Sequence, residues 1–104
     1  MLGRMGEQLR FRAEVWQWDA RTEEGWFFVT LPVGPSEEIA DRPRPPRGFG
    51  SVKVRVRVGG SSWSTSIFPD SKAGAYVLPL KKAVRTAEGI ELGDEVEVEL
   101  ETVE

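Results

Sequence analysis

The chain has 104 residues, of which 39% are hydrophobic, and its formal net charge is −3. This length supports one domain with one core, and the absence of cysteine and histidine excludes disulfides, thiolate chemistry and Ser-His or Cys-His catalysis. No stretch approaches the ~20 apolar residues of a membrane span, and the N-terminus lacks an apolar signal segment, so we expect a soluble cytoplasmic protein.

The N-terminal part predicts two strands after a loosely attached segment, residues 1–8. Apolar and polar residues alternate over residues 9–16, which is the period of a half-buried strand. The polar run 20–25 predicts a hairpin connection. The aromatic and β-branched run 26–31 predicts a central strand covered on both faces, which Pro32 ends because proline cannot donate to the ladder.

A short helix and a stiff loop follow. Ser36 is expected to cap the helix N-terminus, with two glutamates in the first turn where the helix dipole favours them. Three prolines and two glycines then predict a basic loop over residues 41–50.

The second half begins with the clearest strand, residues 52–58, in which valine alternates with lysine or arginine. Gly59-Gly60 predicts a tight hairpin into a strand at 63–68, and residues 69–74 predict a loop. A strand at 75–78, ended by Pro79, precedes a short helix whose buried side is expected to carry Leu80, Val84 and Ala87. Gly89 fits the residue after this helix, and alternation over 95–101 predicts the last strand.

The two halves, about 9–58 and 62–102, resemble each other. Pro32 and Pro79 each follow a strand, Trp16 and Trp63 each lie 16 residues before their proline, and each half ends in an alternating valine strand. We therefore predict an internal repeat within one domain, residues 9–102. The two valine strands are expected to pair, because their polar faces carry opposite charges. Two interlocked β-β-α-β halves indicate a mainly β fold, a double-split β-barrel.

The second half resembles the AbrB/MazE swapped-hairpin unit. The matching segments are LP at 78–79, KKAVR at 81–85, GI at 89–90 and GDEV at 93–96. AbrB/MazE proteins usually supply one such unit per chain and pair two chains. This chain carries both units, so we expect a monomer rather than an obligate dimer.

Nearly the whole length resembles the bacterial and archaeal family called domain of unknown function 1905. The segments that carry this resemblance are FRAEVW at 11–16, GWFFV at 25–29, LP at 31–32, GFGSV at 48–52, WSTSI at 63–67, GAYVLP at 74–79 and KKAVR at 81–85. The resemblance implies a double-split β-barrel and implies no activity.

Two basic clusters are candidate ligand sites. The first is the loop cluster of Arg42, Arg44 and Arg47, since the arginine fork binds phosphate and carboxylate at two points. The second is Lys81, Lys82 and Arg85 on the short helix. Each cluster also fits an ordinary solvated surface.

Other candidates are weighed against simpler interpretations. Ser64 and Ser66 share one face of a strand and could line a polar pocket or face solvent. The tryptophans are expected to fill the core, but Trp16 and Trp18 would form an aromatic patch if their face were outside. Asp19, Glu23 and Glu24 are paired carboxylates at a hairpin tip, where a catalytic pKa shift is not expected.

These observations favour a non-enzymatic module without a cofactor or metal, which binds an anionic or small polar ligand or protein partner. The predicted ligand-binding residues are Arg47, Ser64, Ser66, Tyr76, Lys81 and Arg85. The alternative is an AbrB/MazE-like DNA-binding or antitoxin-type regulator. The net negative charge and the glutamates of the last strand oppose this alternative.

Overall fold

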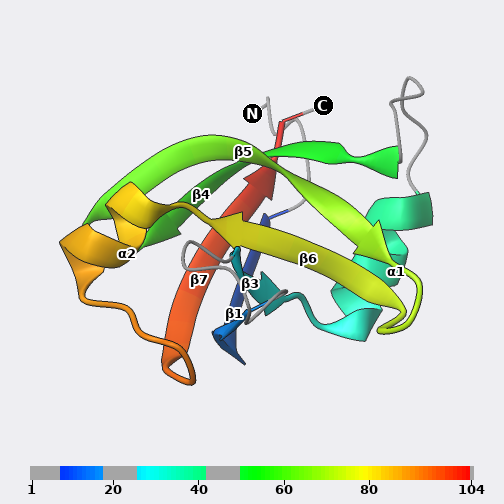
Figure 1. Ribbon diagram of the computed structural model, residues 1–104. Helices are drawn as coiled ribbons and strands as arrows, with labels where there is room; N and C mark the ends of the chain where they lie inside the picture. Colours follow the sequence, from blue (N-terminus) through cyan, green and yellow to red (C-terminus); the bar gives the residue numbers. More distant parts are fainter. Residues whose placement is uncertain (1–7, 18–25, 42–49, 104) are drawn as a thin grey trace.

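The computed structural model describes residues 8–17, 26–41 and 50–103. Their elements in chain order (Figure 1) are β1 (Gln8–Glu14), β2 (Trp16–Gln17), β3 (Phe27–Thr30), α1 (Val33–Asp41), β4 (Val52–Val58), β5 (Ser61–Asp70), β6 (Ala75–Leu80), α2 (Lys82–Glu88) and β7 (Glu95–Thr102). Residues 1–7 of the predicted loose N-terminus, the hairpin connection at 20–25 and nearly all of the Pro-rich loop lie outside the described residues, whereas Gln8 begins β1.

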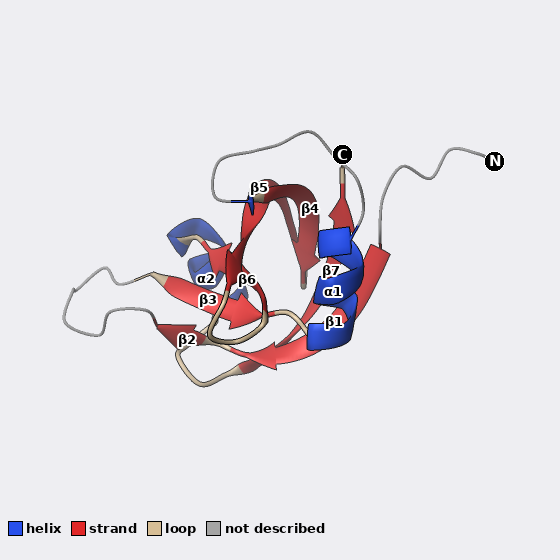
Figure 2. Ribbon diagram, turned by 90° about the vertical axis from the view of Figure 1, so that its right-hand side faces the viewer, coloured by secondary structure: helices blue, strands red, loops and turns tan. Residues whose placement is uncertain are grey.

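The strands form one antiparallel sheet in the order β1-β7-β4-β5-β6-β3-β2. Its two ends, β1 and β2, are consecutive in the chain and are separated only by Val15, so the sheet is strongly curled around the core (Figure 2). The backbone N–H of Val15 donates to the Asp94 carbonyl at 2.8 Å, and its carbonyl accepts from the Gly93 N–H at 2.9 Å. The predicted mainly β, barrel-like fold is thus confirmed as a half-barrel with two short helices.

The valine strands are built as predicted. In β4 every valine is buried and every lysine or arginine is exposed. β4 pairs with β7, as their opposite charges indicated. Complete burial of one such side chain stabilises the fold by about 1.5–3 kcal/mol. The rest of the core comes from the inner faces of the other strands, from α1 through Ile39 and from α2 through Val84.

Two prolines lie inside strands: Pro69, which was expected to begin a loop, belongs to β5, and Pro79, which was expected to end a strand, belongs to β6. β5 pairs with β4 up to Ile67 and with β6 only from Phe68, so Pro69 has a strand neighbour on one side. Pro79 pairs with Phe28 of β3 beyond the last contact of β6 with β5. Because the missing N–H of each proline has no ladder to complete there, both are tolerated.

Both helices begin at different residues from those expected. α1 begins at Val33, so the expected N-cap at Ser36 is wrong: Ser36 lies inside the helix and is buried. α2 begins at Lys82, because Leu80 is the last residue of β6, and Ala87 is exposed rather than buried. Gly89 ends α2 in a left-handed conformation with φ 65°, as predicted.

The expectation that β3 is covered on both faces is also wrong. Val29 is buried on the inner face, whereas Phe28 on the outer face is half-buried. Trp26, just before the strand, is 68% exposed. The reason is the sheet's curl, which gives β3 one face toward the core and one toward solvent.

The strand pairing agrees with the predicted repeat in part but does not establish it. β3 pairs with β6, and β4 pairs with β7, so elements placed similarly in the two halves meet each other. The tryptophans do not match: Trp16 is opposite Phe28 of β3, and Trp63 is opposite Val56 of β4. The internal repeat stays a prediction.

Candidate ligand-binding surface

The outer face of β1, β7, β4 and β5 is a charged surface whose rows are set by strand register. One row runs Arg10, Glu99, Arg57, Ser62, and the next runs Gln8, Glu101, Arg55, Ser64. Lys53 lies opposite Ser66 in a further row. The strand alternation that buries the valines therefore places cations and hydroxyls side by side on the outside.

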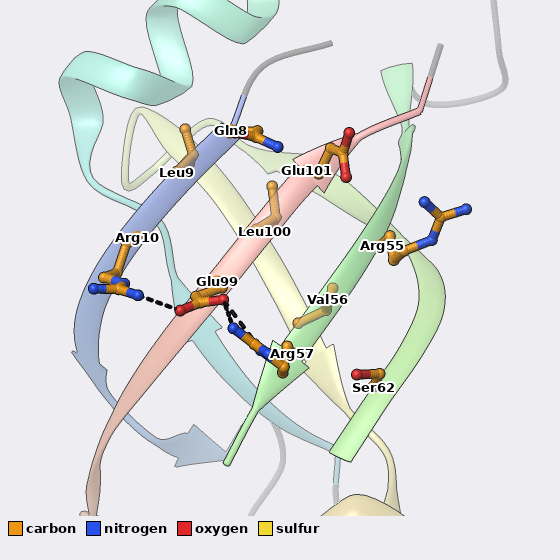
Figure 3. A pocket seen from close by; sticks show the side chains of 10 residues that line it. All are labelled: Gln8, Leu9, Arg10, Arg55, Val56, Arg57, Ser62, Glu99, Leu100 and Glu101. Carbon is orange, nitrogen blue, oxygen red and sulfur yellow. Dashed lines mark hydrogen bonds and ion pairs between the residues drawn. The ribbon is translucent and has the colours of Figure 1, made fainter. Parts of the chain in front are cut away.

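Glu99 is the centre of the first row (Figure 3). Its carboxylate accepts from the Arg10 guanidinium at 2.5 Å and from Arg57 Nε at 3.1 Å, and also from Arg57 Nη2. Arg10 Nε lies 3.6 Å from the Glu97 carboxylate. The hydrogen bond from Arg10, followed by that from Arg57, holds the pKa of Glu99 below its ordinary value.

We expect the stability contribution of Glu99 to disappear in acid. Because its pKa is lowered by folding, the contribution is complete above the ordinary value of 4.5 and is lost as the pH falls through the folded-state pKa. Glu99→Gln should therefore be less stable than the parent chain near neutral pH, and this deficit should shrink steadily as the pH falls below 4.5. Urea unfolding across this range measures the difference. The control is Glu91→Gln, which removes an exposed carboxylate that ion-pairs with no described residue. A stability deficit of Glu99→Gln that is independent of pH would contradict the argument.

The neighbouring cations, Lys53 and Arg55, are not neutralised in this way. Within the described part of the chain, neither forms an ion pair, although Arg55 lies opposite Glu101 in the register. Figure 3 shows the Arg55 side chain pointing away from Glu101. Both side chains are exposed, so their charges are available to a ligand.

A shallow cavity of about 540 Å³ lies over this face. Arg10, Arg55 and Arg57 contribute to its lining, together with Ser62, Glu99 and Glu101. Because Glu99 binds two of the three arginines, the free positive charge is concentrated at Arg55.

The predicted ligand-binding residues are not all neighbours of one another. Ser64, which is exposed, and Ser66, which is half-buried, lie beside Arg55 and Lys53 of β4. Arg47 lies outside the described residues, as do Arg42 and Arg44. The sequence pattern predicts Lys53 and Arg55 only as cross-strand partners of the last strand; their place next to the serines depends on strand register.

Tyr76, Lys81 and Arg85 lie elsewhere. Tyr76 is 7% exposed and belongs to the core, next to α1, where its N–H donates to Ser36 Oγ at 3.1 Å. Lys81 is exposed and precedes α2, which lies on the other side of the molecule from α1 (Figures 1 and 2). Arg85 is held: its Nε donates to the Leu80 carbonyl at 3.1 Å, and its guanidinium lies 4.0 Å from the centre of the Phe27 ring.

The described residues contain no group of three or more acidic side chains arranged to hold a metal ion. The helices in the described ranges are too short and too polar to cross a membrane.

These features define the class: a small half-barrel of antiparallel strands with a charged outer sheet face. The chain belongs to the family described as Domain of unknown function (DUF1905), whose model matches residues 11–100. No curated protein matches the chain significantly. The family resemblance that was drawn from the sequence motifs is confirmed.

Proposed function

We propose that this chain is a non-enzymatic binding module that holds a small anionic group on the outer face of β4 and β5. The observation that carries the proposal is the register of Lys53 with Ser66 and of Arg55 with Ser64. Cations provide charge and donors, and serine hydroxyls donate or accept, so this pairing suits a phosphate or carboxylate group.

Only some of the predicted ligand-binding residues belong to the proposed site. Ser64 and Ser66 belong to the surface, whereas Arg85 is engaged by Phe27 and the Leu80 carbonyl. Lys81 is exposed beside α2 and remains a separate candidate with Arg47. Tyr76 supports the fold rather than the ligand, because it is buried in the core.

The size of the ligand follows from the acids next to the site. The adjacent strand β7 carries four glutamates, Glu95, Glu97, Glu99 and Glu101. A polyanion lying across the face would contact them. Arginines of β1 and β4 pair with Glu95, Glu97 and Glu99, so the repulsion comes chiefly from Glu101 beside Arg55, and it favours a compact anion with one or two charges over a nucleic acid strand.

We expect inorganic phosphate and pyrophosphate, titrated at low ionic strength, to shift the backbone NMR signals of residues 53–55 and 64–66. Arg55→Gln should weaken binding about tenfold, since a charge-assisted hydrogen bond is lost. Lys82→Gln removes an equal charge from the exposed start of α2 and is the matched control. Equal weakening by both variants, or shifts spread over the surface, would contradict the proposed site.

A DNA-binding assay on the same protein sample distinguishes the DNA-binding alternative from the proposed function. A regulator of the AbrB/MazE type should bind random duplex DNA with an affinity that falls steeply with salt. No binding at low salt, where phosphate attraction is strongest, removes this alternative.

A further inference from the structure

The outer face of β2, β3, β6 and the end of β5 is apolar, in contrast to the charged face. Register aligns Trp16, Phe28 and Pro79 in one row across three strands. Thr30, Val77 and Phe68 form the next row. Strand alternation places both rows on the side opposite the core residues Val29 and Leu78.

A groove of about 1110 Å³ runs along this face, with walls that include Trp16, Phe28, Phe68, Pro69 and Pro79. The rings of Trp16 and Phe28 stack with centroids 5.1 Å apart and an interplanar angle of 25°. The indole N–H of Trp16 donates to Thr30 Oγ1 at 2.9 Å. The polar tip of this indole is therefore satisfied within the chain, which leaves a fixed apolar wall.

Trp26 also lines the groove and is 68% exposed, and Phe68 is 38% exposed. Large aromatic side chains dominate interface energetics when they fill a pocket. One surface thus carries an apolar groove and, in its wall, a largely exposed indole. A second copy related by a twofold axis would offer a groove to each Trp26, which is the self-complementarity that a symmetric dimer requires.

The rim of the groove carries one acid and one base in the same turn, Asp70 and Lys72. Asp70 Oδ1 accepts from the Lys72 backbone N–H at 3.1 Å, which fixes the turn and leaves the Lys72 ammonium exposed. A twofold axis can set Asp70 of one copy against Lys72 of the other at two equivalent contacts.

We infer that this aromatic face is the interface of a reversible symmetric dimer, in which Trp26 of each chain enters the groove of the other and Asp70 meets Lys72. Each chain keeps its own half-barrel in this dimer, so no strands are exchanged. The dimer is therefore compatible with a chain that folds alone. The charged face of β4 and β5 lies on the other part of the sheet, so this inference stands independently of the proposed function.

Sedimentation velocity from about 5 to about 500 µM tests the dimer, because a reversible dimer with a micromolar dissociation constant passes from monomer to dimer over this range. We expect the parent chain to pass from monomer to dimer across the range. Trp26→Ala should raise the dissociation constant about 30-fold, as expected for a central aromatic anchor. A chain that stays monomeric throughout would leave the groove to a different partner and overturn the inference.

Charge exchange tests the twofold arrangement. Asp70→Lys makes the rim wholly basic and Lys72→Asp makes it wholly acidic, so each variant alone should dimerise about tenfold more weakly. An equimolar mixture should recover the parental affinity, because each rim then faces its opposite. Arg12→Glu, which changes the charge by the same amount on β1, should leave self-association unaltered. Circular dichroism checks that each variant is folded. A folded mixture that associates no better than its components would refute the arrangement.

Discussion

Replacement of Leu78 by alanine should lower the free energy of unfolding by about 2–5 kcal/mol. Leu78 is 0% exposed and lies opposite Val29 of β3, so the deletion removes apolar contacts and leaves a cavity in the core. A domain of this size has a total stability of about 5–15 kcal/mol, so the loss would be a large share of it.

Leu92→Ala is the matched control for this effect. Leu92 is 51% exposed in the turn between α2 and β7, and its truncation should change stability by no more than about 0.5 kcal/mol. Urea unfolding followed by tryptophan fluorescence gives both values. Similar costs for the two leucines would show that Leu78 is not a core residue in solution.

The second large effect is expected at Ser36. The Tyr76 carbonyl accepts from the Leu31 N–H at 2.9 Å, and its amide, on the same side of β6, donates to Ser36 Oγ at 3.1 Å. The hydroxyl of α1 thus continues the ladder after β3 has ended. Ser36→Ala would leave a buried N–H without its acceptor and should cost about 1–3 kcal/mol.

Hydrogen exchange at the Tyr76 amide reports this bond directly. In Ser36→Ala the Tyr76 amide should exchange faster than the loss of global stability alone explains. The exchange of β4 amides should follow the global stability. Ser64→Ala, which removes an exposed hydroxyl, should change stability by less than about 0.5 kcal/mol. Unchanged exchange and stability in Ser36→Ala would mean that another acceptor replaces the hydroxyl.

Local patterns explain why much of the fold could be predicted. In β4 and β7 the apolar residues recur at every second position, and this period fixes both the strand and its buried face. Gly89 ends α2 where predicted because a left-handed residue costs little for glycine. The prolines were misleading, since their tolerance depends on where a neighbouring strand stops, which is not a local property.

The candidate sites were harder to predict for the same reason. Ser64 and Ser66 were recognised as a hydroxyl row, but the residues beside them, Arg55 and Lys53, are set by the pairing of β4 with β5. Arg85 looked available in the sequence, whereas Phe27, 58 residues earlier, is brought against it by the pairing of β3 with β6. The exposure of Trp26 likewise depends on which face of β3 the curl of the sheet leaves outside.

Composition and local pattern were enough to predict the mainly β class, the inward faces of the valine strands, the end of α2 and the exclusion of histidine and cysteine chemistry. These follow from composition and from residue periods of two and 3.6, which act over a few positions. Three further features became clear from the folded chain alone: where β5 changes its neighbour, which arginines Glu99 neutralises and which aromatic rings stay exposed. Those features depend on register between strands that are distant in the chain, and register is fixed by the packing of the whole core.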